Sequence, residues 1–458
     1  MAMNPQPIPK STKKAFWLRW PFFLTVIPLA LMLVIAISLG VNEWRSVGRV
    51  KAELVRIQSS GHPVDDATMT RWFLDHTSQE GAAKWSEILS LATAGSNGFQ
   101  LEQLPYLGVA PIPTEIEPGG QWKSEPAVAE YLEWMRPVID EIHAAAQYPT
   151  PVWQPIEFRG FATLLEELQN SRTLARLLSL DVEHALYHGD SDRALRSLQA
   201  MQGVAAAFDW QICIIADLVN LALHQTHQGM IQRSLAVNPW SEEQLQLLQH
   251  QMSHPREVPR RWQNVIAGER ALAYGALDNG IDEYVDGTVL QRLEWIWRIP
   301  SVQENLLTRF RDIEILGDQG IVGLVERAKQ LTQAWLRPRG QQVFFSFTHM
   351  FIGSFEAYAR AIEREEMLRR LTLTAIAIKR FQLSTGQWPE RLDQLEQVGL
   401  KPVDWHTTSA GQFGYEVDDE VAYVWSLDSL NETTVPADRP TLSVSDSLQP
   451  QTPLVVIR

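Results

Sequence analysis

The longest apolar stretch of the chain runs from Pro21 to Val41 and contains no charged side chain. As an α-helix at about 1.5 Å per residue, it spans the roughly 30 Å hydrocarbon core of a bilayer. It is too uniformly apolar for an amphipathic helix of a soluble domain. It is also longer than the roughly 7–15 apolar residues of most secretory signals, although Ala36 and Ser38 resemble a cleavage site. The pattern therefore favours a retained transmembrane anchor over a cleaved signal or a buried core helix.

Basic residues flank this predicted anchor on both sides. Four precede it within residues 1–20, a tail without acidic residues, and four more lie between Arg45 and Arg56. The positive-inside count is therefore nearly balanced. A short basic tail ahead of a first apolar segment is typical of a signal-anchor, so we expect a cytoplasmic N-terminus and an extracytoplasmic body. The expected location is the bacterial inner membrane, which the chain crosses once.

After the anchor, apolar residues recur mostly at helical spacing, which predicts a mainly α-helical protein. The first of them continue the membrane helix as an amphipathic stalk to about Ile57. A helix predicted over 124–146 begins at Ser124 as its N-cap and should kink at Pro137. The clearest helical hairpin spans Thr173–Phe208. A repeat solenoid needs about three such units, so we expect a plain αα-hairpin within a bundle.

Towards the C-terminus the pattern changes from helical to mixed. A long amphipathic helix is predicted from about Phe344 to Leu383, and Gly386 is expected to be its C-cap. Two short runs of strand-like composition, 413–417 and 421–426, follow it and predict a β-hairpin. The final residues are rich in Pro, Ser and Asp, which is typical of a flexible tail.

These patterns divide the chain into six segments. They are a basic cytoplasmic tail (1–20), the transmembrane anchor (21–41), a stalk with an N-terminal helical region (42–155), a helical-hairpin domain (156–342), a long helix with a small α+β module (343–430) and a flexible tail (431–458). The predicted fold class is thus mainly α, with a transmembrane helix at the N-terminus, a large αα-hairpin region and a small α+β module near the C-terminus.

The segment AIAIKRFQLSTGQWPERLDQL (375–395) combines the end of a long helix with Gly-x-aromatic-Pro and a Leu-x-x-Leu turn, and the two strand-like runs follow it. This arrangement resembles the soluble region of type II secretion pseudopilins. The matching residues are Phe381, Gly386, Trp388, Pro389, Leu392, Leu395, Phe413, Gly414, Tyr415, Tyr423 and Ser426. The resemblance covers about 60 residues. Because the glutamate-bearing pilin start is missing before the apolar segment, the resemblance implies a local module and not pilus assembly.

Three further pieces of sequence accompany the single anchor. They are GHPVDDATMTRWF, ARLLSLDVEHALYHGDSDRAL and QWPERLDQL. Together with the anchor, they resemble a group of bacterial membrane-anchored helical proteins for which no activity is established. That resemblance implies the architecture and brings no function.

Charge and cysteine content exclude several classes of function. The formal net charge is −14 at pH 7, and an acidic body repels phosphate backbones, so no nucleic-acid partner is expected. Cys213 is the single cysteine, which rules out an intramolecular disulfide and a cysteine-based metal site. We expect it to be a small buried hydrophobe.

Six of the eleven histidines fall in three close pairs, which are His184/His188, His224/His227 and His250/His254. Spacings of three or four place both rings of a pair on one helix face. If the helices of the first two pairs are neighbours, four side chains would converge on a divalent metal. These candidate ligands are Asp181, His184, His188 and His224. The alternative is that they are surface or cap histidines. Since neither HExxH nor a paired Glu-x-x-His motif is present, no metal or other cofactor is expected.

No motif for phosphate binding or nucleophilic catalysis is present. The acidic run 278–287 lacks the glycine that an EF-hand loop has at its sixth position and the glutamate that it has at its twelfth. The sequence therefore favours an extracytoplasmic, non-enzymatic scaffold or protein-binding module, bound to the bilayer by its N-terminal helix and to another envelope protein by its helical grooves. The first alternative is an accessory component of a secretion or envelope-assembly apparatus, by analogy with the pseudopilins. The second is a metal-dependent hydrolase that uses the histidine pairs.

Overall fold

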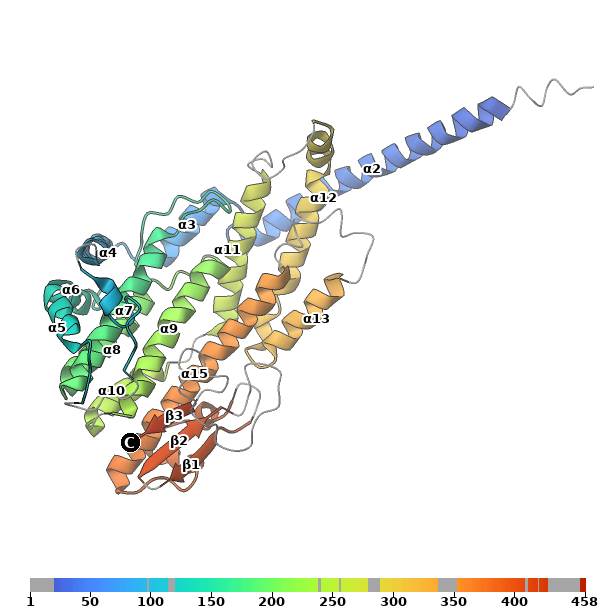
Figure 1. The fold of residues 1–458 in the computed structure, drawn as a ribbon. Coiled ribbons are helices and arrows are strands. Elements are labelled where there is room, and N and C mark those ends of the chain that lie inside the picture. Colours follow the sequence, from blue (N-terminus) through green and yellow to red (C-terminus); the bar gives the residue numbers. More distant parts are fainter. Residues whose placement is uncertain are drawn as a thin grey trace, which may run out of the picture.

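The computed structural model describes residues 20–96, 99–113, 120–237, 240–254, 257–278, 289–336, 352–407, 411–418, 420–426 and 454–458. Helices predominate among them, and a small antiparallel sheet lies at the end of the body farthest from the N-terminal helix (Figure 1). The predicted fold class is confirmed: the protein is mainly α, with one N-terminal apolar helix and a small C-terminal sheet. The acidic run 278–287, which was considered as an EF-hand loop, lies outside the described residues except for Asp278.

The elements follow one another in a simple chain order. The helices are α2 (Trp20–Ser59), α3 (Asp66–His76), α4 (Ala82–Ser96), α5 (Glu125–Trp134), α6 (Arg136–Ala145), α7 (Glu166–Tyr187), α8 (Ser191–Ala207), α9 (Ile214–Leu235), α10 (Glu242–Met252), α11 (Val258–Asp278), α12 (Val289–Glu314), α13 (Leu324–Leu336) and α15 (Ile352–Thr385). Short 3₁₀ segments are η1 (Leu101–Gln103), η3 (Gly317–Gln319), η4 (Leu392–Val398) and η5 (Pro402–Trp405). The strands are β1 (Gly414–Asp418), β2 (Val421–Trp425) and β3 (Leu454–Ile457).

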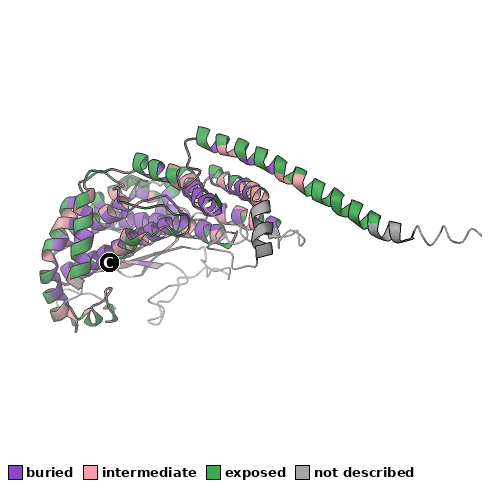
Figure 2. Cartoon of the chain, turned by 90° about the horizontal axis from the view of Figure 1, so that it is seen from above, coloured by how far each residue is buried: buried purple, intermediate pink, exposed green. Residues whose placement is uncertain are grey.

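Helix α2 contains the apolar segment and the predicted stalk in one unbroken helix, and Pro28 lies inside it. The large apolar side chains from Val26 to Val41 are exposed. In the second half of the helix, by contrast, Val50 and Ile57 are buried. Figure 2 shows the exposed half standing away from the body. The stalk prediction is therefore confirmed, and the apolar half has no covering from the described residues.

The second half of α2 packs along α12, and the two helices run in the same direction. Three polar contacts follow the interface: Ser301 N donates to Glu43 Oε2 at 3.2 Å, Arg49 Nη2 donates to Glu304 Oε2 at 2.8 Å, and Arg56 Nη2 lies 3.7 Å from Glu314 Oε2. Buried apolar side chains of both helices lie in one cluster with residues of α11, α13 and α15. The direction of α2 is thus fixed relative to the body.

The predicted hairpin is confirmed as α7 and α8, joined by a bend in which Gly189 has φ +71°. A bend of this kind favours glycine because other residues are strained at positive φ. Helix α9 packs on this hairpin and on α15, and α10 packs on α15 as well. Residues in the first part of α15 belong to the cluster beside α2, while those from Met367 to Phe381 belong to the main core. Helix α15 therefore connects the two cores.

The small sheet contains the predicted β-hairpin and a third strand from the segment that was predicted to be a flexible tail. The predicted hairpin is present as β1 and β2, and β3 pairs with the other side of β2. The final residues, Leu454–Ile457, are thus a strand and not part of a flexible tail, while 431–453 lie outside the described residues. The reason is packing, because Val455 and Ile457 are buried in the main core.

The predicted helix over 124–146 is also corrected. It is two helices, α5 and α6, separated at Met135. Pro137 lies in the first turn of α6, where a missing N–H costs little, so it starts a helix and does not kink one. Ser124 precedes α5, but its side chain makes no capping hydrogen bond.

Candidate functional site

One helix among the described residues is long and apolar enough to cross a membrane. Over Val26–Ser59 its most apolar window has a mean hydropathy of 2.1, and none of that window is buried. A core helix of a soluble domain would bury most of such a window. The exposure therefore contradicts the core-helix alternative and leaves a membrane anchor or a signal sequence.

The three predicted histidine pairs lie on three different helices. His184 and His188 are at the C-terminal end of α7, His224 and His227 are in α9, and His250 and His254 are at the end of α10. The α7 pair is the most closely associated, with its Nε2 atoms 3.2 Å apart and its ring centroids 4.5 Å apart. The α9 pair is buried.

A carboxylate joins the α7 pair. Among the described residues, Glu125, His184 and His188 have ligand atoms that all lie within 4.8 Å of one another. Glu125 Oε1 is 3.4 Å from the Nε2 atom of each imidazole. Two of the four predicted ligands are thus brought together, whereas Asp181 and His224 are not members of this group.

Sequence reasoning missed Glu125 because it is 63 positions away from His188 and on another helix. It is the first residue of α5, where a carboxylate is favoured by the helix dipole. That local reason predicts an acidic residue at this position. Nothing in the local pattern predicts that the start of α5 contacts the end of α7.

Asp181 has a structural role instead. It is fully buried and pairs with Arg193 of α8, whose Nε atom lies 3.0 Å from Asp181 Oδ1. Ser197 of α8 also donates to this carboxylate. Because a buried charge needs a compensating partner, Asp181 is committed to fastening α7 to α8.

The environment of His184 favours the neutral form of its ring. Burial is the main reason that its pKa is lowered, and the positive charge of Arg193 and the neighbouring His188 act in the same direction. Glu125 opposes them more weakly. A neutral imidazole has one nitrogen with a free lone pair, which is the form that binds metals.

Two aromatic side chains border this histidine–glutamate cluster, as we call Glu125, His184 and His188. The Trp122 ring lies 6.4 Å from that of His184, and the Tyr187 ring lies 5.1 Å from that of His188. The His188 side chain is nevertheless 52% exposed. The cluster is therefore bordered by aromatic rings and remains open to solvent.

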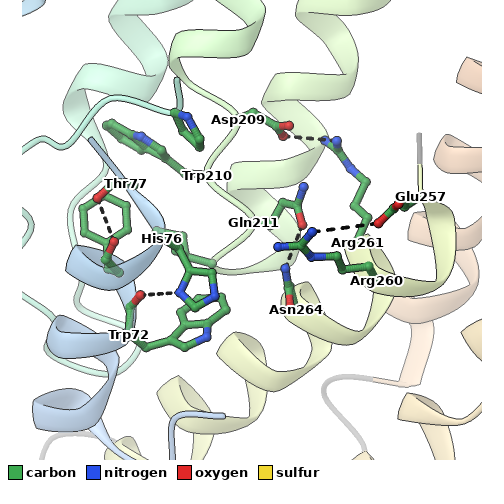
Figure 3. Close-up of a pocket in the computed structure, with 13 residues that line it drawn as sticks. Trp72, His76, Thr77, Asp209, Trp210, Gln211, Glu257, Arg260, Arg261 and Asn264 are labelled. Carbon is green, nitrogen blue, oxygen red and sulfur yellow. Dashed lines mark hydrogen bonds and ion pairs between the residues drawn. The ribbon is translucent and has the colours of Figure 1, made fainter. Parts of the chain in front are cut away.

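A second candidate site is a cavity of about 300 Å³ between α3, the connection after α8 and the start of α11 (Figure 3). Trp72 and Trp210 provide aromatic surface. Asn264 Nδ2 donates to Gln211 Oε1 at 3.0 Å. Arg261 Nη1 lies 3.1 Å from Asp209 Oδ1 at the edge of this cavity. The cavity thus combines aromatic and polar surface, but most of its polar groups are paired.

Arg261 is part of a closed ionic cluster that we call the Arg261 cluster, formed by Arg261, Asp209, Asp217 and Tyr358. Its Nε atom is 2.9 Å from Asp217 Oδ2, and Tyr358 Oη donates to the same oxygen at 2.8 Å. Burial opposes the charge on Arg261, but Asp209 and Asp217 outweigh it and hold the pKa above its usual value. The guanidinium stays charged, and it fastens α9, α11 and α15 together.

A third candidate is a groove of about 580 Å³ between α6, α8 and α10, which we call the α6–α8–α10 groove. A Cβ atom on Gly203 would lie only 2.8 Å from Ala146 Cβ, so glycine allows α8 to approach closely here. The described residues that line the groove include Arg196 and His143 but no carboxylate. Its glutamine side chains are Gln147, Gln199, Gln202 and Gln251.

Comparison of the chain with family models, with curated proteins and with solved structures finds no match. A function for this chain is therefore inferred from the geometry of the described residues.

Proposed function

We propose that the chain is a single-pass protein of the bacterial inner membrane whose helical body serves as an extracytoplasmic scaffold for another envelope protein. The observation that supports this most directly is helix α2. Its exposed apolar half continues without a break into a half that packs along α12. Such a helix positions the body at a fixed angle to the bilayer, which suits a scaffold.

Retention of the anchor is supported by the same helix. Ala36 and Ser38, the only candidates for a cleavage signal in the sequence pattern, lie inside α2 rather than in an extended segment. Full-length protein should stay in the membrane fraction after an alkaline carbonate wash, with its N-terminal residues still present in the mass spectrum. Recovery of a soluble chain that begins near residue 39 would identify the segment as a signal sequence.

Topology can be tested with single cysteines, because the native thiol should not react. Cys213 is buried as predicted, and burial is the main reason that its pKa is raised to about 12. We expect Gln58→Cys to react with a membrane-impermeant maleimide in cells with a permeabilised outer membrane, and Ser11→Cys to react only after lysis. The parent chain is the control. The reverse labelling would invert the proposed orientation.

We assign partner binding to the α6–α8–α10 groove. Arg196 favours acidic side chains, since no carboxylate is among the described residues that line the groove. The preferred partner segment is therefore an acidic stretch of polypeptide.

A photocrosslinking residue at Leu247, which lines the groove and is 51% exposed, tests this assignment. The same residue at Leu164, which is 70% exposed elsewhere, is the matched control. We expect one envelope protein to be captured from position 247 only, and we expect Arg196→Glu to abolish the capture. Equal capture from both positions, or capture that survives Arg196→Glu, would rule the groove out.

The C-terminal module supports a second proposal, an accessory role in a secretion or envelope-assembly apparatus. Gly386 has φ +76° after the end of α15, and Leu392 and Leu395 are buried next to it, in the order of the pseudopilin-like motif. Strand β1 is an outer strand of the sheet, and Val417 on it is 37% exposed. Val417→Lys should then impair secretion while the amount of protein stays unchanged; normal secretion would remove this role.

A further inference from the structure

The three ligand atoms of the histidine–glutamate cluster form a nearly equilateral triangle. Its sides are 3.2 Å between the Nε2 atoms of His184 and His188, and 3.4 Å from each of them to Glu125 Oε1. A tetrahedral ion with bonds of about 2.0–2.1 Å places its ligand atoms roughly 3.3 Å apart. Hydrogen bonds between nitrogen and oxygen are usually shorter, at about 2.7–3.2 Å. The triangle has the size of one face of a metal coordination tetrahedron.

We propose that Glu125, His184 and His188 bind one divalent transition-metal ion, with Zn²⁺ as the preferred ion. Two imidazole nitrogens and one carboxylate oxygen form a donor set that suits this ion and leaves its fourth position for water. Cysteine ligands, which would favour softer ions, are not involved. This inference concerns a site that the scaffold role does not require.

The donor charges fit the ion. Two neutral imidazoles and one carboxylate leave a single positive charge on the bound complex. The nearby Arg193 opposes a bound cation, but part of its charge is compensated by the fully buried carboxylate of Asp181. The overall negative charge of the chain also attracts cations.

The position of Arg193 sets a condition for binding. Its Nη1 atom lies 3.4 Å from His184 Nδ1, and an ion on Nε2 requires the ring proton to be on Nδ1. Arg193 must then donate only to Asp181, which it already contacts through Nε. Binding therefore requires the Nδ1–H tautomer of His184 and no rearrangement of the helices.

The site is accessible, and it joins two parts of the body. His188 is half exposed and Glu125 is 23% exposed, so an ion can enter from solvent. Glu125 is the first residue of α5, and both histidines are at the end of the first hairpin helix, α7. A bound ion therefore links the N-terminal helical region to the helical hairpin.

The experiment uses the full chain in detergent, stripped of metal with a chelator and dialysed. Titration with Zn²⁺ by calorimetry, and with Co²⁺ by visible absorption, should show one ion per chain and a tetrahedral Co²⁺ spectrum. His188→Ala should weaken Zn²⁺ binding by roughly a hundredfold or more, since even outer-shell changes cost 10–100-fold. Glu125→Gln should weaken it as well, because a neutral amide replaces the carboxylate.

The α10 pair offers a matched control. His250 and His254 have the same spacing of four, and their ring centroids are 5.2 Å apart, but they do not belong to a three-ligand group. His250→Ala should bind Zn²⁺ as tightly as the parent chain. The proposal is overturned if the parent chain binds no stoichiometric ion, if both His188→Ala and Glu125→Gln bind it unchanged, or if only His250→Ala loses it. Helical content by circular dichroism confirms that the variants are folded.

Discussion

The Arg261 cluster and the histidine–glutamate cluster are built from similar groups but differ in how their charges are satisfied. In the first, Arg261 is buried and pairs with the fully buried Asp217, and Asp209, which is 28% exposed, pairs with the same guanidinium. In the second, Glu125 and the two histidines point their ligand atoms towards one another while His188 remains half exposed. The closed cluster satisfies itself, whereas the open cluster retains the capacity to bind something else.

This difference separates a stabilising role from a binding role. A charge buried with its partner costs several kcal/mol when the partner is removed, because the remaining charge cannot reach water. A group at the surface loses little, since water replaces its partner. Loss of stability should therefore follow mutation of the closed cluster, and loss of ligand binding should follow mutation of the open one.

The largest expected effect comes from the closed cluster. Arg261→Met leaves the fully buried Asp217 without its counter-charge, so we expect the free energy of unfolding to fall by about 3–5 kcal/mol. Thermal unfolding followed by circular dichroism measures it. Adding Asp217→Asn should recover part of the loss, because the amide is neutral. A loss below about 1 kcal/mol would show that water reaches the Arg261 cluster. The two clusters would then not differ in how their charges are satisfied.

A buried histidine without a partner gives the next largest effect. Neither ring nitrogen of His227 has a hydrogen-bond partner among the described residues, and burial lowers its pKa to about 4. The unfolded chain, with a pKa near 6.5, binds the proton more readily, so His227 contributes stability at neutral pH that is lost as the pH falls from about 6.5 towards 4. Between pH 7 and pH 5 the loss is about 2 kcal/mol.

His227→Met isolates this contribution. The change in unfolding free energy between pH 7 and pH 5 should be smaller in the variant than in the parent chain by about the same 2 kcal/mol. His250→Ala, at an exposed position of α10, is the control and should leave the pH dependence unchanged. Identical pH dependence in all three proteins would mean that His227 takes up its proton as readily in the folded chain as in the unfolded one.

The contrast also explains what the sequence was able to predict. Periodicity predicted the continuous helix α2 and the hairpin of α7 and α8, because each depends on residues three or four positions apart. The pairing of His184 with His188 follows from the same spacing on one helix. Local patterns were therefore sufficient wherever the contact is within one element or between adjacent ones.

Contacts between distant segments were not predictable in this way. Glu125 joins the histidines only because α5 packs on α7, and β3 forms only because β2 offers it an unpaired side. The composition of Leu454–Ile457, LVVI, is typical of a strand, but nothing in it identifies β2, about 30 positions earlier, as the partner. The partners of the candidate ligand Asp181 were hidden for the same reason, since Arg193 and Ser197 lie on the following helix.

A smaller effect on stability is expected in the open cluster. In metal-free protein, Glu125→Gln replaces a partly exposed carboxylate that is 3.4 Å from both imidazoles by an amide of the same size, so the unfolding free energy should fall by less than about 1 kcal/mol. With Zn²⁺ at 100 times its dissociation constant, the parent chain should gain about 2.7 kcal/mol and the variant much less. Melting curves with Zn²⁺ and with a chelator measure both. Equal gains would locate the ion elsewhere.

The smallest effect concerns the junction of α2 and α12. Arg49 pairs with Glu304 at 2.8 Å, but its side chain is 53% exposed, so Arg49→Ala should not change thermal unfolding measurably. Val50, the next residue, is buried in the interface, and Val50→Ala should lower the melting temperature because a cavity replaces its methyl groups. Equal effects would mean that the surface ion pair orients the stalk. A larger effect of Val50→Ala than of Arg49→Ala on the melting temperature would show that apolar packing, and not the surface ion pair, holds the two helices together.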